Sequence, residues 1–316
     1  MHPSGVDGMQ RASQENREWK RHKKVTVPWA TYDAHRLNEC KRVIDLREAF
    51  IELDQPVQRR EFQLSQLTVL LLLKLMFDVS YRTLARAIKD LYLFQALAMK
   101  RAPCYKTIQN TMQYLTESVL MEINQGLIPQ ATAIGGFDSS GMKTHRRGAW
   151  IVLRFHLPQH RRDFKKIHLF VDLVSKKILY CLVTTGKASD AKQVKKLLKG
   201  CQWTRVDIIL ANGGYDTREC FNAIAGVGAT PGIPVRRNAI TKSHGCYSRR
   251  KAVLAQQHDY SEWEGKVHYR MRCVVESIFS GLKRRFGEYL FSIKDQFRNV
   301  EMWLRTILWN VVIYPR

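Results

Sequence analysis

Apolar residues recur along this 316-residue chain at two different spacings, and the spacing changes near residue 130. Before that point it is helical, with apolar positions three and four residues apart. The most apolar run, residues 67–77, predicts a buried helix, because eleven residues interrupted by Lys74 are too few to span a bilayer. No membrane segment is therefore expected.

Two more helices are predicted before the spacing changes. Residues 80–91 place three leucine and isoleucine side chains on one face, and residues 103–115 form the next helix with Thr107 as its N-cap. Lys and Arg on the outside of these helices fit a helix-turn-helix module that reads DNA. Ordinary helical packing explains the pattern nearly as well. The sequence thus predicts a helical domain over residues 31–128 and leaves both roles open.

Beyond residue 130, short runs rich in β-branched and aromatic residues alternate with turns, which is typical of strands. Helical spacing returns at 188–198 and 217–225, so strands come first and a β-α-β alternation follows. This order predicts an α/β domain over residues 129–316, with a central sheet covered by helices. The predicted strands are 132–138, 150–157, 167–173, 178–185 and 206–211.

Residues 229–266 interrupt this alternation. Pro231, Gly232 and Pro234 predict a constrained turn, and the remainder of the segment is basic. We interpret it as a basic insertion in the α/β domain, with a disordered loop as the alternative. A last helix over residues 300–313 is predicted to cover the core.

The charge of the chain indicates a polyanionic partner. Lys and Arg number 52 against 28 Asp and Glu, which gives a formal charge of +24 at pH 7. The 45% of hydrophobic residues describe a packed globule rather than a basic tail, so a phosphate backbone is the natural ligand. Residues 1–30 are polar and basic. We interpret them as a mobile basic arm, either simply solvated or adding salt-dependent attraction to DNA.

Cysteine usage and the first residues indicate where the protein works. The seven cysteines are scattered and never spaced as C-x-x-C, which fits a reduced cytosol and neither a disulfide framework nor a zinc site. The first thirty residues contain no apolar core, so no signal peptide is predicted. The protein is expected to stay inside the cell.

The candidate chemistry lies on a predicted helix over residues 269–286. At 100° per residue, a stripe within an arc of about 60° carries an aromatic hydroxyl, two cations and a carboxylate. These are Tyr269, Arg272, Glu276 and Lys283. An apolar stripe roughly 90° away is typical of a core-facing helix. Periodicity alone is also explained by a surface helix in which Arg272 and Glu276 form an i,i+4 pair.

These four residue types at these four spacings resemble the Y-R-E-K signature of bacterial and archaeal insertion-sequence transposases with a DDE catalytic core. Two upstream stretches stand in the order that this family requires. Residues 137–141, Phe-Asp-Ser-Ser-Gly, look like the strand of the first carboxylate, which is Asp138 here. Residues 211–216, Ala-Asn-Gly-Gly-Tyr-Asp, are similar to the second motif. The resemblance covers roughly residues 60–312.

The resemblance implies a fold and a set of roles. The fold is a ribonuclease-H-like mixed sheet flanked by helices and preceded by an all-helical N-terminal domain. The implied cofactor is Mg²⁺ or Mn²⁺, expected as two ions that assemble together with DNA. Metal binding and catalysis are assigned to Asp138, Asn212 and Glu276. Transposon-end phosphates are assigned to Tyr269, Arg272 and Lys283.

The chain departs from the family pattern at Asn212, which stands in place of the second catalytic Asp. An amide oxygen brings no negative charge, so one ion loses much of its attraction. Asp216 follows Gly213 and Gly214, whose permissive backbone is one route for the loop to bring a carboxylate inward. We expect weak or absent catalysis, with Asp216 as a substitute ligand as the alternative.

The sequence thus predicts a cut-and-paste DDE transposase acting on double-stranded DNA, at its own terminal inverted repeats and at a target, as a homodimer that pairs two ends. A DNA-binding protein that keeps the fold without catalysis is the first alternative. A metal-dependent nuclease without strand transfer is the second. Basic residues at 143–147, 161–162 and 165–166 are expected to line the DNA cleft. A prokaryotic, cytoplasmic, nucleoid-associated protein is expected.

Overall fold

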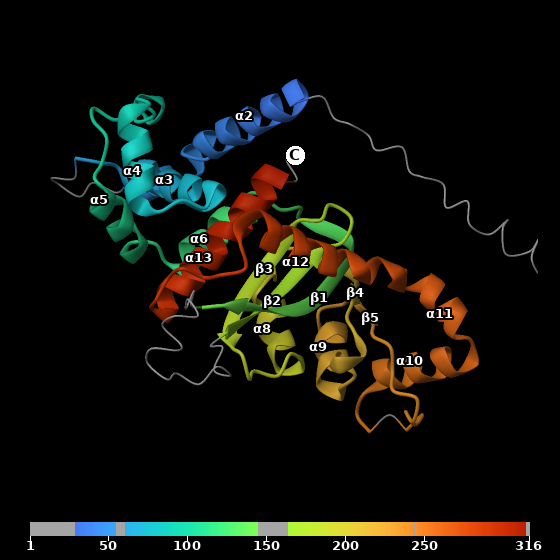
Figure 1. Ribbon diagram of the computed structural model, residues 1–316. Coiled ribbons are helices and arrows are strands. Elements are labelled where there is room, and N and C mark those ends of the chain that lie inside the picture. Colours follow the sequence, from blue (N-terminus) through green and yellow to red (C-terminus); the bar gives the residue numbers. More distant parts are fainter. Residues whose placement is uncertain (1–28, 55–60, 145–163, 243, 314–316) are drawn as a thin grey trace, which may run out of the picture. The chain divides into compact units, whose positions relative to one another are not determined.

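Strand β1 (Ala131–Lys143) lies in the middle of a five-stranded sheet of order β3-β2-β1-β4-β5. The computed structural model describes residues 29–54, 61–144, 164–242 and 244–313. β2 (Phe164–Asp172) pairs antiparallel with β1 and with β3 (Ile178–Thr185). β4 (Arg205–Leu210) is parallel to β1, and β5 (Thr230–Gly232) is parallel to β4. This mixed order confirms the predicted ribonuclease-H-like sheet (Figure 1).

Helices cover both faces of this sheet (Figure 1). They include α8 (Val194–Gly200), α9 (Arg218–Gly226), α12 (Cys273–Phe286) and α13 (Asp295–Leu308). α8 and α9 lie on one face, in a buried cluster with Phe137 and Phe170. α12 and α13 lie on the other face. α12 comes close to β1 because Gly136 has no side chain: a Cβ there would lie 2.9 Å from a methyl group of Val275.

The helices before the sheet are α2 (Trp29–Asp45), η2 (Glu48–Asp54), α3 (Leu64–Phe77), α4 (Tyr81–Asp90), η3 (Gln95–Leu97), α5 (Tyr105–Asn110), η4 (Thr111–Gln113) and α6 (Glu117–Gln125). The predicted buried helix is confirmed, because every residue of α3 except Phe77 is buried. The predicted N-cap at Thr107 is wrong. Cys104 precedes α5, and the Thr107 hydroxyl lies within the first turn, 3.2 Å from Cys104 Sγ.

Over the described ranges, no single helix is long and apolar enough to cross a membrane. α3 and α4 meet that test of length and composition only as a pair, across a bend of 111°.

The chain divides into two units, Met1–Cys40 and Lys41–Arg316. The second unit contains both the helices from α3 to α6 and the sheet. Within it, α13 packs against α6, α3 and β3. The predicted boundary at residue 128 therefore falls inside this unit, between α6 and β1.

The predicted insertion stays a prediction, but the disordered loop given as its alternative is wrong for most of the segment 229–266. Its first part is strand β5, and Pro231 is tolerated there because an edge strand has one side without ladder hydrogen bonds. The basic remainder folds into α10 (Tyr247–His258) and α11 (Tyr260–Lys266). Val253 and Trp263 anchor these two helices, since both side chains are buried.

Four of the five predicted strands are confirmed, residues 178–185 with the predicted ends and the other three with altered ends. The fifth, residues 150–157, lies outside the described residues. So do residues 1–28 of the predicted basic arm. The predicted helix at 188–198 is a short 3-10 turn, η5 (Ala191–Gln193), followed by α8. The last predicted helix begins earlier, as α13, and ends in a π turn, η8 (Trp309–Ile313).

Candidate active site

Asp138 lies on β1 just beyond the point where β4 stops pairing with it. The last pair of that ladder joins Gly136 to Leu210, two residues before Asp138. Asp138 Oδ1 accepts the backbone N–H of Ser139 at 2.8 Å, and the side chain is 16% exposed. Burial raises the pKa of this carboxyl, partly offset by the Ser139 N–H and by the positive charge of Arg272.

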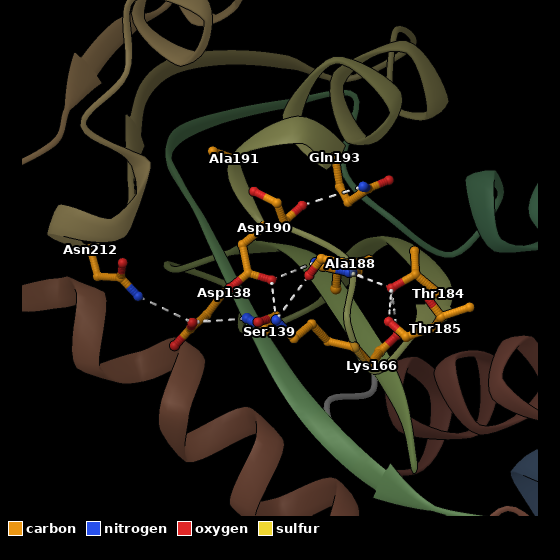
Figure 2. Close-up of polar contacts among 12 residues, drawn as sticks. Asp138, Ser139, Lys166, Thr184, Thr185, Ala188, Asp190, Ala191, Gln193 and Asn212 are labelled. Atoms are coloured by element: carbon orange, nitrogen blue, oxygen red, sulfur yellow. Dashed lines mark hydrogen bonds and ion pairs between the residues drawn. The ribbon is translucent and has the colours of Figure 1, made fainter. Parts of the chain in front are cut away.

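Asn212 approaches Asp138 from the end of β4, after the fully buried Ala211. Its Nδ2 lies 3.4 Å from Asp138 Oδ1 (Figure 2). Its Oδ1 accepts the backbone N–H of Gly214 at 2.8 Å. That second bond closes the turn η6 (Gly213–Tyr215) and fixes which end of the amide is oxygen. Asn212 therefore turns its N–H₂ group, rather than its oxygen, toward the carboxylate.

The residues predicted as one helix over 269–286 form two elements. A 3-10 turn, η7 (Tyr269–Arg272), precedes α12, and His268 begins it with a positive φ of 53°. A tightened turn at a helix N-terminus is common, and periodicity does not reveal it. The predicted apolar stripe is confirmed as buried and consists of Val275, Ile278, Phe279, Leu282 and Phe286.

Arg272 connects two carboxylates. Its Nη1 lies 3.6 Å from Asp138 Oδ2, and its Nη2 donates to Glu276 Oε1. The Arg272 side chain is 20% exposed, whereas Glu276 is 56% exposed. One guanidinium thus stands between a largely buried carboxylate on β1 and an open one on α12.

Lys283 and Tyr269 complete the stripe at its two ends. Lys283 Nζ donates to Ser140 Oγ at 2.6 Å, two residues along β1 from Asp138. The Tyr269 ring lies 5.4 Å from that of Trp263, and burial raises the pKa of its hydroxyl. The structure therefore brings Arg272 and Lys283 to β1, and Arg272 links Glu276 to Asp138. Tyr269 lies beside Trp263 of α11 and also interacts with Arg272.

The alternative in which Asp216 replaces the carboxylate missing at position 212 is wrong. The Asp216 side chain is fully buried and accepts two hydrogen bonds from Arg249, at 2.7 and 3.0 Å. It also accepts the backbone N–H of Arg236 at 3.1 Å. Asp216 thus fastens α10 and the segment after β5 to the η6 turn, and both of its oxygens are engaged there.

A model of the transposase DDE domain matches residues 130–311. That span runs from the start of β1 into η8 and contains all three candidate catalytic positions. The chain belongs to this family. Solved structures with a weak likeness include the piggyBac transposase in a synaptic complex with hairpin DNA, 9% identical over 88% of this chain and 72% of that chain, with a TM-score of 0.40. A pre-cleavage Mos1 transpososome is 11% identical over 81% and 79% of the two chains, with a TM-score of 0.25.

The basic residues expected to line the DNA cleft of this DDE domain differ in their contacts, and some lie outside the described residues. Lys143 ends β1 and pairs with Glu288 at 2.7 Å, and Lys165 on β2 pairs with Asp295 at 2.8 Å. Residues 145–147 and 161–162 lie outside the described residues. Lys166 alone of the described set turns toward the neighbourhood of Asp138, where it meets Asp190.

Sequence reasoning missed Asp190. It stands at the turn into η5 and faces β2, where its Oδ1 lies 3.0 Å from Lys166 Nζ and 3.5 Å from His168 Nδ1 (Figure 2). The negative charge of Asp190 contributes to the raised pKa of Asp138, after burial and the charge of Glu276. The one sequence signal was a carboxylate near the start of the predicted helix at 188–198, which is common in any helix.

Oxygen donors suited to a divalent cation gather where β1 meets α12. Among the described residues, no three His, Cys, Asp or Glu side chains are close enough, as arranged, to hold a metal ion. Asp138 and Glu276 nevertheless already share one cation, the Arg272 guanidinium. Hard cations such as Mg²⁺ and Mn²⁺ bind carboxylate oxygens, so this pair fits them once Arg272 is drawn away.

Proposed function

We propose that this DDE domain catalyses metal-dependent DNA strand cleavage and strand transfer at the terminal inverted repeats of an insertion sequence. The observation that carries the proposal is the pair of carboxylates from β1 and α12 on a single guanidinium. An ordinary surface i,i+4 pair does not include a largely buried carboxylate from a neighbouring strand. The formal charge of +24 supports a DNA substrate.

In this proposal Asp138 and Glu276 hold the divalent cations, and Asn212 stands at the third position. Two such ions activate the attacking oxygen and stabilise the leaving oxygen in phosphodiester chemistry. Lys283 and Tyr269, at the ends of the stripe, bind backbone phosphates beside the scissile bond. Arg272 neutralises the two carboxylates before DNA binds and binds a backbone phosphate afterwards. Both roles suit its guanidinium group, which forms bidentate hydrogen bonds with phosphate as it does with carboxylate.

A second function is favoured by the orientation of Asn212. Its amide N–H₂ faces Asp138 and its oxygen caps the η6 turn, so position 212 offers no free oxygen to a metal ion as arranged. A protein of this kind that binds transposon ends without cutting them, acting as a repressor or end-binding protein, is therefore the second candidate. Both candidates share DNA binding and differ in chemistry.

A strand-transfer assay separates these functions. The full chain would be incubated with a duplex that carries the inverted repeat flanking its coding region, plus a supercoiled target and Mg²⁺ or Mn²⁺. Joined products support the transposase. Cleavage without joining indicates a nuclease, and retarded but intact duplex indicates the DNA-binding candidate. Absence of binding at low salt would contradict all three.

A further inference from the structure

Asp190 lies level with Asp138 along the sheet. His168 on β2 pairs directly across from Ser139, the residue that follows Asp138. Asp190 Oδ1 lies 3.5 Å from His168 Nδ1, so along the strand direction Asp190 lies about one residue from the level of Asp138. Figure 2 shows the Asp190 side chain directed from the start of η5 toward the strands that carry these residues.

The two carboxylates reach β1 from opposite faces. Side chains alternate along a strand, so Asp138 shares the α12 face with Ser140, while Ser139 and His168 point to the α8 face. The ladder between β1 and β4 ends two residues before Asp138, and the Asn212 side chain lies beside Asp138 on that side of β1. The negative charge of Asp190 nevertheless contributes to the raised pKa of Asp138, so the two carboxylates lie within electrostatic range of each other.

Four buried polar atoms near Asp190 have no hydrogen-bond partner among the described residues. They are Asp190 Oδ1, His168 Nδ1, Gln193 Oε1 and Tyr215 Oη. Lys166 lies close enough to Asp190 for an ion pair, but the two groups are not aligned for a hydrogen bond. Buried polar atoms normally have partners, so such a concentration is typical of a place that binds an ion or ordered water.

Tyr215 links this group of atoms to Asp138. Its side chain is 1% exposed, and its ring lies 6.4 Å from that of Phe137, the neighbour of Asp138 on β1. Burial raises the pKa of its hydroxyl, and the charges of Asp190 and then Asp138 raise it further. The buried hydroxyl is therefore within range of both carboxylates.

We propose that Asp190 and Asp138 together hold a divalent cation beside β1, so that Asp190 supplies the negative charge that Asn212 lacks. This inference rests on the proposed function, which takes Asp138 to be the centre of the metal site. The cation would replace Lys166 as the main counter-charge of Asp190. Lys166 keeps a second partner, the carbonyl oxygen of Ala188 at 3.1 Å, to which its ammonium group would remain bonded.

Binding of Mn²⁺ tests the inference without any need for turnover. Free Mn²⁺ would be counted by electron paramagnetic resonance during titration of the full chain, alone and with an arbitrary 30-base-pair duplex, with the duplex-only signal subtracted. The variants are Asp190→Asn, Lys166→Ala and Asp138→Asn. Asp207→Asn is the matched control, because that carboxylate on β4 is 56% exposed and pairs only with Arg205 among the described residues. Circular dichroism verifies folding of each variant.

The expected result is a loss of Mn²⁺ affinity of at least about tenfold in Asp190→Asn and in Asp138→Asn, with Asp207→Asn unchanged. Lys166→Ala should bind Mn²⁺ as tightly as the parent chain or more tightly, because it removes a competing cation. If Asp190 were only a structural partner of Lys166, both variants would lower the melting temperature and neither would change Mn²⁺ affinity.

The outcomes also separate this inference from the function on which it rests. Unchanged affinity in Asp190→Asn with a loss in Asp138→Asn overturns the role of Asp190 and leaves the proposed function standing. Absence of Mn²⁺ binding to the parent chain, with and without duplex, overturns both. Should Asp190→Asn fail to fold, weaker Mn²⁺ binding by Lys166→Ala would by itself contradict the inference.

Discussion

The Asn212 side chain points its amide nitrogen at Asp138, with Nδ2 lying 3.4 Å from Oδ1 of the carboxylate. Where the resemblance implies a second Asp, this chain therefore places a neutral hydrogen-bond donor, and the nearby positive charge is that of Arg272. An aspartate at this position would set two carboxylates side by side, and these repel each other unless a cation lies between them or one is protonated. Asn212 thus avoids the repulsion that a second carboxylate would add at this point.

Arg272 is predicted to compete with metal ions for Asp138 and Glu276. Replacing it by Gln removes a positive charge between the two carboxylates, so Mn²⁺ affinity in the absence of DNA should rise about tenfold. DNA affinity should fall, because a phosphate partner is lost. Calorimetric titration with Mn²⁺ measures the first effect, and Arg272→Lys serves as the control that keeps the charge. Lower Mn²⁺ affinity in Arg272→Gln would mean that Arg272 only holds the carboxylates in place.

Glu276 and Lys283 are predicted to separate chemistry from binding. Glu276→Gln keeps the shape of a 56% exposed side chain, so DNA affinity should stay within about twofold while cleavage falls at least about 10²-fold. Lys283→Ala should weaken DNA binding and reduce its salt slope by about one phosphate contact. Filter binding and initial cleavage rates measure both. If both variants cleaved DNA as fast as the parent chain, Glu276 and Lys283 would have no role in catalysis or DNA binding, and the stripe would be an ordinary exposed helix face.

His168 is predicted to make folding stability depend on pH. Burial is the main cause that lowers its pKa to about 4, so the unfolded chain takes up a proton between pH 6.5 and 4 that the folded chain does not. Stability must therefore fall as pH drops through this window, by up to about 3 kcal/mol. Urea unfolding of the parent chain and His168→Gln, in buffer with a chelator, measures the difference. Parallel pH profiles for the two proteins would contradict the assignment.

Part of this arrangement was predictable from the sequence, because it depends on residues that are close together along the chain. The helical spacing of residues 269–286 correctly separated the apolar stripe from the stripe that carries Glu276 and Lys283. The strand around Asp138 was recognisable from its own motif. Both inferences needed only residues within one or two turns of each other, the range over which periodicity is informative.

The features that escaped prediction depend on tertiary contacts between distant residues. Asp190 reaches the level of Asp138 only through the register of β2 and the connection from β3 to β4. Asp216 is withdrawn from the site by Arg249, 33 residues away in sequence. Pro231 read as a turn because an edge strand and a turn share the same local signal. Spacing along the chain contains none of this information.

DNA binding is predicted to be strongly salt-dependent. With a formal charge of +24, we expect at least six phosphate contacts and a loss of roughly 10³-fold in affinity between 50 and 200 mM salt. Fluorescence anisotropy with a labelled duplex measures this at several salt concentrations. Both proposed functions depend on DNA binding, so an affinity independent of salt would remove the basis for a nucleic-acid substrate.

Replacing Asn212 by Asp gives the most direct test that position 212 belongs to the metal site. Initial rates of Mg²⁺-dependent cleavage of a terminal-repeat duplex would be compared for the parent chain and Asn212→Asp. Adding the second carboxylate should raise the rate at least roughly 10²-fold, equivalent to about 2.7 kcal/mol of transition-state stabilisation. Equal rates in the two proteins, or slower cleavage by Asn212→Asp, would contradict the assignment of position 212 to the metal site.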